Sequence, residues 1–114
     1  MTEPGDLEFA YLTTSGRITG GAHRVELWFV LHEGTVFLLA GEGDRSDWVR
    51  NLMISPDVIL ELGDRRRTTR ARVVADPEED ATARRLMLEK YEPGRGSDLS
   101  SWGRTAVPIA VEWA

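Results

Sequence analysis

The chain has 114 residues, of which 41% are hydrophobic and 29% are charged, and its formal net charge is −5. These values fit one globular domain with its own core, and the negative charge argues against general binding to nucleic acids or to anionic membranes. The sequence contains no cysteine, which excludes disulfides, thiolate nucleophiles and cysteine metal sites.

The N-terminal segment MTEPGDLEFA has neither a basic start nor a long apolar run, so we expect no signal peptide. No stretch of the sequence is long and apolar enough to span a bilayer. We therefore expect a cytoplasmic protein with a single domain over residues 1–114, in which residues 1–6 are frayed.

The first third of the chain predicts three strands. Residues 7–14 are rich in aromatic and β-branched residues, which favour strands. A glycine-bearing loop over residues 15–21 separates them from a second strand over residues 24–31, part of which is continuously apolar. His32-Glu33-Gly34 predicts a hairpin turn, since Gly34 can adopt a positive φ, and a returning strand follows over residues 35–40.

A second glycine-bearing loop, GEGDRSD, leads into a predicted short helix with the sequence DWVRNLMI. Ser46 or Asp47 can cap the start of this helix, and Pro56 cannot continue it. The apolar positions expected to face inward are Trp48, Val49 and Leu52.

Two further strands and a longer helix are predicted next. Residues 58–62 alternate apolar and acidic side chains, Gly63-Asp64 turns the chain, and residues 65–75 read as a long strand. Asp76 can cap a helix that begins with Pro77 and reaches Tyr91, because proline suits the first helical position.

The C-terminal part predicts a break, a loop and a last strand. PGRG at residues 93–96 ends the helix, residues 97–105 form a loop, and AVPIAVEW closes the chain as a strand. Pro108 within it indicates an edge position or a bulge. Six strands and two helices predict a mainly β (α+β) antiparallel barrel, with side chains filling its interior and any ligand bound in a groove outside.

Residues 13–24 form the first candidate site. Three glycines let the backbone approach a ligand and point N–H groups at it, and arginine can hold a phosphate through two parallel hydrogen bonds. The alternative is an ordinary strand connection with solvated charges. The glycines are Gly16, Gly20 and Gly21, the cationic side chains are Arg17, His23 and Arg24, and the hydroxyls are those of Thr13, Thr14, Ser15 and Thr19.

Three other places carry weaker signals. Small residues at Ala40, Gly41 and Gly43 leave room for a flat ring that Trp48 can stack on; otherwise this is a tight turn with Trp48 in the core. An arginine-rich strand can meet a polyanion or pair with acidic neighbours such as Glu61; its residues on one face are Arg66, Thr68, Arg70 and Arg72. The last place is Tyr91 with the loop residues Ser97, Ser100, Ser101, Trp102 and Arg104.

Ordinary catalytic motifs do not occur. The two histidines, His23 and His32, lack metal-ligand spacing, so we expect no metal site, and no GxSxG nucleophile motif is present. An enzyme built from these residues is therefore expected to use a bound organic cofactor.

The segments TTSGRITG, RVELWFV, LLAGEG, DWVRNLMISPDVILELG and SSWGRTAVPIAVEW resemble the flavin/deazaflavin oxidoreductases, which have a split β-barrel (FMN-binding-like) fold related to pyridoxamine 5'-phosphate oxidases. The resemblance covers residues 8–113 and is strongest to the deazaflavin-dependent nitroreductase and quinone reductase branch. It implies that Gly16, Arg17, Thr19 and His23 hold the anionic tail of the cofactor, that Ala40, Gly41 and Gly43 border its ring, and that Trp48 and Asn51 shape the pocket.

The chain departs from this branch in its charges and tyrosines. Ile18 and Glu42 stand where the branch often has lysines, EPGRGSD replaces a tyrosine cluster, and the amphipathic N-terminal extension is missing. Arg24, Arg45 or the arginine-rich strand can compensate for the lost charge. Flavin mononucleotide (FMN), which carries one phosphate, needs fewer cations and is the alternative cofactor.

The resemblance implies an oxidoreductase that binds coenzyme F-420 (8-hydroxy-5-deazaflavin) and passes a hydride to a small quinone, enone or nitro compound. Tyr91, Ser101 and Tyr11 are the candidates for a proton donor. The alternatives are an FMN-binding split-barrel reductase and a protein that binds either cofactor without catalysis. A homodimer through the barrel surface is a further expectation; Trp28, Phe29, Trp102 and Trp113 then lie in the interface or, otherwise, in the core.

Overall fold

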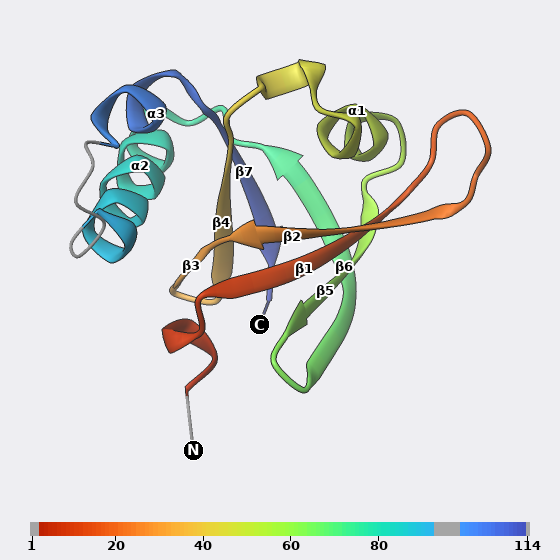
Figure 1. The fold of residues 1–114 in the computed structure, drawn as a ribbon, viewed down its shortest axis with the longest axis horizontal. Coiled ribbons are helices and arrows are strands. Elements are labelled where there is room, and N and C mark those ends of the chain that lie inside the picture. Colours follow the sequence, from red (N-terminus) through yellow and green to blue (C-terminus); the bar gives the residue numbers. More distant parts are fainter. Residues whose placement is uncertain (1–2, 93–98, 114) are drawn as a thin grey trace.

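A computed structural model of the chain describes residues 3–92 and 99–113. Seven strands form one curled antiparallel sheet in the order β2-β1-β5-β6-β7-β4-β3 (Figure 1). Because β2 and β3 follow each other in the chain but lie at opposite ends of this order, the sheet curls back on itself as a split barrel. The strands are β1 Phe9–Ser15, β2 Ala22–Trp28, β3 Val30–His32, β4 Thr35–Ala40, β5 Asp57–Leu62, β6 Arg65–Val73 and β7 Val107–Glu112.

This architecture confirms the predicted split antiparallel barrel with helices. The main difference in the sheet is that the strand predicted over residues 24–31 is interrupted at Phe29. The N–H of Phe29 donates to the Tyr91 hydroxyl rather than to a strand, at 2.9 Å, and the phenyl ring is buried. The chain therefore changes neighbours at Phe29, pairing with β1 before it and with β4 after it.

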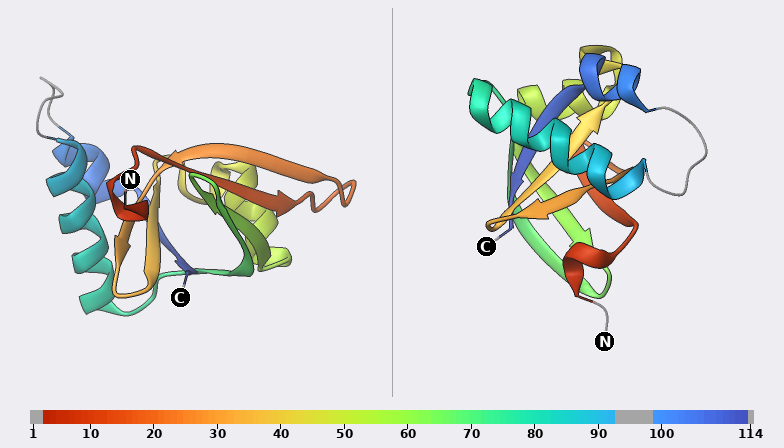
Figure 2. Two further views of the ribbon diagram at one scale, coloured as in Figure 1. Left: turned by 90° about the horizontal axis from the view of Figure 1, so that it is seen from below. Right: turned by 90° about the vertical axis from the view of Figure 1, so that its left-hand side faces the viewer.

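Three helices pack on the outside of the sheet: α1 Asp47–Ile54, α2 Pro77–Tyr91 and α3 Ser100–Thr105. The views in Figure 2 place α2 and α3 together on one side of the molecule and α1 on the other. Short 3₁₀ turns, η1 Pro4–Asp6 and η2 Gly43–Arg45, precede β1 and α1. None of the helices in the described part is long and apolar enough to cross a membrane.

The start of α2 and the end of α1 follow the sequence signals, whereas Ser46 lies at the N-cap position of α1 without a side-chain hydrogen bond to the helix. The Asp76 carboxylate accepts a hydrogen bond from the Glu79 N–H at 2.9 Å, as its place before Pro77 predicts. The α1 helix ends at Ile54, ahead of Pro56. The predicted break over residues 93–96 lies outside the described residues.

The prediction of a loop over residues 97–105 is wrong for residues 100–105, which form the helix α3. Gly103 has no side chain, so α3 approaches α2 closely: a Cβ at Gly103 would lie 2.8 Å from Leu88 Cδ1. The Arg84 guanidinium on α2 also donates to the Gly103 and Arg104 carbonyl oxygens at 2.9 and 3.0 Å. Tertiary contacts thus stabilise a helix too short to show in the sequence pattern.

Side chains fill the barrel interior. One cluster packs inside the barrel, and two smaller clusters pack between the sheet and α2 and α3. β4 contributes to all three, with Leu38 in the barrel and Phe37 and Leu39 under the helices, which explains why TVFLLA is apolar on both faces. A ligand must therefore bind outside the barrel.

Two other expectations change. Pro108 lies on β7, between β6 and β4, and not at an edge. The Pro108 carbonyl oxygen accepts a hydrogen bond from the Val74 N–H at 3.0 Å, so this residue faces β6. The N–H that proline lacks would point to the same side, just before the first paired residue of β7 on that side, Ile109. At the N-terminus, Pro4–Asp6 forms a 3₁₀ turn where fraying was expected.

Candidate functional site

The connection between β1 and β2 is a compact loop that projects beside α1 (Figure 1). The Gly16 N–H donates to the Gly21 carbonyl oxygen, and the Gly20 N–H donates to the Gly16 carbonyl oxygen, each at 2.7 Å. Gly20 has a φ of 75°, a conformation that glycine adopts without strain. The Gly21 N–H donates to Thr19 Oγ1 at 3.2 Å.

These bonds correct one expectation about the loop. The sequence predicts glycine N–H groups that point at a ligand, whereas those of Gly16, Gly20 and Gly21 all bond within the loop. The Arg17 N–H is also engaged, by the side chain of Asn51. Binding of an anion at this loop would therefore depend on side chains more than on these four backbone N–H groups.

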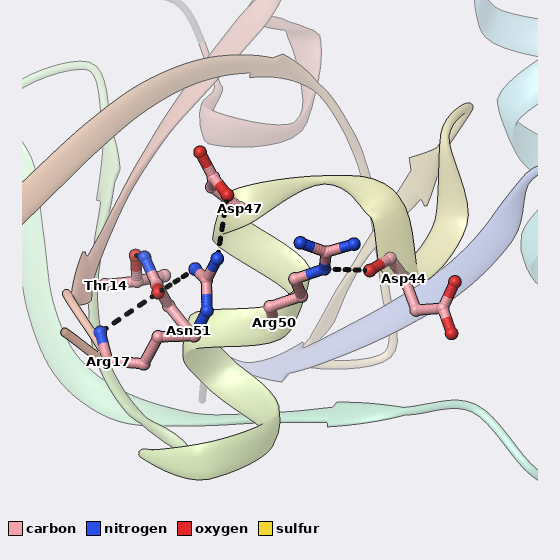
Figure 3. A network of polar contacts seen from close by, with 6 residues as sticks. All are labelled: Thr14, Arg17, Asp44, Asp47, Arg50 and Asn51. Carbon is pink, nitrogen blue, oxygen red and sulfur yellow. Dashed lines mark hydrogen bonds and ion pairs between the residues drawn. The ribbon is translucent and has the colours of Figure 1, made fainter.

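Asn51 fastens the loop to α1 (Figure 3). Its Oδ1 accepts from the Arg17 N–H at 3.2 Å and from Arg17 Nη1 at 2.9 Å, while its Nδ2 donates to Thr14 Oγ1 at 3.1 Å. Asn51 is 2% exposed and Thr14 is 1% exposed, and they are the two buried polar residues of the described chain. Because buried polar groups must be satisfied, this network fixes both the loop and the direction of the arginine.

The Arg17 guanidinium has one charged partner. Its Nη2 lies 3.1 Å from Asp47 Oδ1 at the start of α1. The Arg17 side chain is 22% exposed, and that of Asp47 is 81% exposed. Since a guanidinium carries five N–H donors, these contacts leave part of its donor edge for a ligand.

A hollow of about 260 Å³ opens beside this arginine. His23 lies directly against Gly16, because a Cβ at Gly16 would come within 2.6 Å of His23 Nε2. Only glycine permits this close approach. The lining residues are Gly16, Arg17, Ile18, Thr19, His23, Asp47 and Asn51. Five residues predicted to bind the cofactor thus meet at one place; their binding role stays a prediction.

Arg24 lies elsewhere, on the other face of β2. Its Nε donates to Glu61 Oε1 at 2.9 Å, and its guanidinium lies 4.0 Å from the centre of the Tyr11 ring. The Tyr11 hydroxyl donates to Glu26 Oε2 at 2.6 Å, and this bond raises the pKa of Tyr11. The hydrogen bond from Arg24 lowers the pKa of Glu61. Arg24 and Tyr11 therefore belong to a surface cluster of charges outside the hollow.

The second predicted site, after β4, is joined to the first through α1. Arg50 Nε on α1 donates to the Asp44 carbonyl oxygen of η2 at 2.7 Å (Figure 3). A second hollow, of about 350 Å³, is lined by Arg17, Asp44, Arg50, Met53 and Ile54. Arg17 therefore borders both hollows, and α1 connects the two loops.

The small residues of this second loop have different surroundings. Ala40 is buried at the end of β4, and Trp48 is half-buried against the barrel core. A Cβ at Gly41 would lie 3.4 Å from Trp102 Cδ1, and one at Gly43 would lie 3.2 Å from Val107 Cγ2. Gly41 is exposed, so a flat group that rests on this loop would meet Gly41 and Trp102 before Ala40.

The three candidate proton donors do not line either hollow. Tyr91 is 4% exposed, and its hydroxyl lies 2.7 Å from the Glu8 carbonyl oxygen and 2.8 Å from that of Phe29. The Tyr91 ring stacks on Trp28 with centroids 4.5 Å apart. Ser101 is exposed on α3. The hydroxyls of Tyr91 and Tyr11 are thus engaged within the fold.

The arginine-rich strand β6 pairs with acidic residues. Arg72 makes a bidentate contact with Glu79 at 2.6 and 2.8 Å, which lowers the pKa of Glu79. Arg70 lies 3.4 Å from Asp57, and Arg66 is opposite Glu61 in the sheet register. This arrangement favours the acidic-neighbour interpretation over a polyanion site.

Lys90 has a structural role that the sequence pattern does not reveal. Its Nζ donates to the Leu7 and Phe29 carbonyl oxygens at 2.7 and 2.9 Å and lies 3.8 Å from the centre of the Phe29 ring. Burial lowers the pKa of Lys90 to about 8. Lys90 and Tyr91 on α2 thus both bond the backbone of Phe29, where the strand is interrupted.

The curled seven-stranded antiparallel sheet with helices packed outside it defines a split barrel of the kind found in F420-dependent reductases. The chain belongs to the family of F420H(2)-dependent quinone reductases, whose model matches residues 4–113. No functionally curated protein matches the sequence.

Solved structures share the fold at low sequence identity. An F420-H2 dependent reductase, FDR-A, is 21% identical with a TM-score of 0.73, covering 92% of this chain and 93% of that chain. A protein described as a domain-swapped dimer is 23% identical with a TM-score of 0.75, covering 92% of this chain and 80% of that chain. HutZ, a heme storage protein from Vibrio cholerae, is 15% identical with a TM-score of 0.73, covering 94% of this chain and 82% of that chain. The fold alone therefore does not define the ligand.

Proposed function

We propose that this protein is a reductase that uses reduced coenzyme F-420 and delivers a hydride to a small unsaturated acceptor, such as a quinone, an enone or a nitro compound. Family membership supports the cofactor class. The observation that carries the proposal is the placement of Arg17: Asn51 fixes its guanidinium at the rim of a hollow that it shares with Thr19 and His23.

The residues around Arg17 fit the anionic tail of such a cofactor. A guanidinium binds phosphate and carboxylate groups bidentately, and His23 and Thr19 add a ring nitrogen and a hydroxyl on the same hollow. Arg50 places a second guanidinium on the adjoining hollow. Arg50 can compensate for part of the charge that the chain lacks at Ile18 and Glu42.

We place the ring of the cofactor against the loop after β4, at Gly41 and Gly43. When bound, the reduced deazaflavin supplies the hydride. The chain contributes binding at Arg17, a flat approach at Gly41, and an aromatic wall at Trp102, whose Cδ1 would lie 3.4 Å from a Cβ at Gly41. These groups orient the reactants and exclude water from one side.

The proton donor stays a proposal among Tyr91, Ser101 and Tyr11. The engaged hydroxyls of Tyr91 and Tyr11 favour Ser101, which is exposed on α3. A Ser101→Ala variant that keeps cofactor affinity but loses turnover would support this assignment. Unchanged turnover would exclude Ser101 and leave Tyr91, Tyr11 or a solvent proton as the donor.

The proposal is tested by titrating the purified protein with coenzyme F-420 and, separately, with FMN, followed by fluorescence quenching. Turnover is then measured with quinone, enone and nitro acceptors. Binding of F-420 with turnover supports the proposal. Binding of FMN instead indicates an FMN-dependent reductase, F-420 binding without turnover indicates a non-catalytic binding protein, and binding of neither cofactor rejects a redox role.

We also propose a homodimer, supported by a similar structure described as a domain-swapped dimer and by the open sheet edges β2 and β3. The four aromatic residues, for which interface and core were the alternatives, lie inward: Phe29 and Trp113 are buried, and Trp28 and Trp102 pack on the cluster under α2 and α3. A dimer would therefore use an exposed edge, of which β2 is the longer. Light scattering at several concentrations tests the oligomeric state.

A further inference from the structure

One of the side chains that line the hollow beside Arg17 is a carboxylate. Of its seven lining residues, Asp47 is the one that carries a carboxylate. Asp47 Oδ1 lies 3.1 Å from Arg17 Nη2, and the Asp47 side chain is 81% exposed. A solvated carboxylate therefore occupies part of the donor edge that an anionic ligand would use.

The charges in this hollow cancel without a ligand. Arg17 contributes one positive charge and Asp47 one negative charge. A phosphate or carboxylate that reaches Arg17 must displace Asp47 or bind beside it. In either case the ligand loses part of the attraction that the guanidinium alone would provide.

We propose that Asp47 is an internal competitor for the anionic tail of the cofactor, and that it sets both the affinity of the site and its preference among tails of different charge. This inference rests on the proposed function. On this inference Arg17 raises the affinity for the anionic tail by attracting it, whereas Asp47 lowers that affinity by repelling it.

The structure separates this role from a positioning role. Asn51 already orients Arg17 through two hydrogen bonds, one to its backbone N–H and one to Nη1. Asn51 is buried and in turn held by Thr14, so the arginine keeps its direction without Asp47. If Asp47 instead positioned Arg17, its removal would weaken binding.

The charge of the tail determines how strongly Asp47 acts. Repulsion between Asp47 and a ligand grows with the number of negative charges that the ligand brings near Arg17. A deazaflavin that lacks the phosphate and glutamate tail brings none. Asp47 is therefore expected to oppose long, multiply charged tails more than short ones, and to have no effect on the tail-less compound.

The experiment compares the wild-type protein with Asp47→Asn and with Glu89→Gln. Asparagine keeps the shape of Asp47 and removes its charge. Glu89→Gln is the matched control, since it makes the same change in net charge and also removes the partner of an exposed arginine, Arg85 at 3.0 Å, but on α2, away from α1 (Figure 1). Each protein is titrated with coenzyme F-420 and with the tail-less deazaflavin, and fluorescence quenching gives the dissociation constants.

We expect Asp47→Asn to bind F-420 about three- to tenfold more tightly than the wild type at low salt, with the difference shrinking as salt is added. The tail-less deazaflavin should bind all three proteins equally, and Glu89→Gln should match the wild type with both compounds. Equal or weaker F-420 binding by Asp47→Asn would overturn the inference while leaving the proposed function intact.

A wild-type protein that does not bind F-420 would reject the proposed function, and a second probe then tests the competition separately. Inorganic pyrophosphate is titrated into the same three proteins, with the NMR signals of the two histidine rings as the readout, because His23 lies against Gly16 in the hollow. Tighter pyrophosphate binding by Asp47→Asn supports competition by Asp47. Equal or weaker binding removes it.

Discussion

Replacing Asn51 with alanine should loosen the loop beside Arg17 and destabilise the protein. The Asn51 amide makes three hydrogen bonds, with Thr14 Oγ1, the Arg17 N–H and Arg17 Nη1. Alanine removes them all. It leaves the Thr14 hydroxyl without this partner at a site that is 1% exposed.

The expected loss follows from these contacts. A buried polar group left unsatisfied costs about 1–3 kcal/mol, and a typical net hydrogen bond contributes about 1 kcal/mol. The Arg17 guanidinium can turn to solvent, because its side chain is already 22% exposed, so its share of the loss is small. We therefore expect Asn51→Ala to lower the free energy of unfolding by about 2–4 kcal/mol.

Urea unfolding, followed by tryptophan fluorescence, measures this change. With a slope of about 1–3 kcal/mol/M for a protein of this size, the midpoint should fall by about 1–2 M. A double-mutant cycle with Thr14→Val should give a coupling of about 1 kcal/mol, because both variants remove the same hydrogen bond. A loss below about 0.5 kcal/mol for Asn51→Ala would show that this buried network does not stabilise the loop.

Three further variants test the α2 side of the molecule. Burial lowers the pKa of Lys90 from 10.5 to about 8, so on raising the pH the folded protein loses this proton before the unfolded chain does. The free energy of unfolding of the wild type should therefore rise by about 1–3 kcal/mol between pH 8 and 10.5, relative to that of Lys90→Met. Parallel unfolding curves for the two proteins over that range would contradict this. Gly103→Ala should cost about 1–2 kcal/mol in urea unfolding, because the new Cβ would lie 2.8 Å from Leu88 Cδ1; a gain would show that Leu88 moves aside freely. Tyr91→Phe should lose about 1–3 kcal/mol of stability with turnover unchanged, because the hydroxyl bonds the Phe29 backbone. A loss of turnover without a loss of stability would instead identify Tyr91 as a proton donor.

Local sequence patterns predict most of the sheet and both longer helices. Alternation and turn residues fix the strands around Gly34 and Gly63, where φ is 82° and 62°. The Asp76-Pro77 pair marks the start of α2. These elements are determined by residues that are neighbours in the chain, so the sequence alone is informative about them.

The errors occur where distant residues decide the structure. The break at Phe29 depends on a hydroxyl 62 residues away, at Tyr91. The α3 helix depends on its packing against Leu88 and Arg84 of α2. No local pattern carries this information, because each contact exists only after the sheet has curled.

In the candidate site, too, the sequence indicates which residues take part but not the contacts that depend on folding. The resemblance to deazaflavin oxidoreductases brought Gly16, Arg17 and His23 together in the prediction, and the structure places them around one hollow. The internal use of the glycine N–H groups could not be read from the sequence, because it depends on how the loop closes. The position of Asp47 against Arg17 likewise depends on how α1 packs on β1.

A fluorescence titration of the wild type and Arg17→Ala with coenzyme F-420 tests most directly whether Arg17 holds the cofactor. We expect saturable binding by the wild type and at least about tenfold weaker binding by Arg17→Ala, since a charge-assisted hydrogen bond contributes about 1.5–3 kcal/mol. Circular dichroism of both proteins verifies that the barrel is intact. Equal affinity of two folded proteins would contradict the claim that this arginine holds the cofactor.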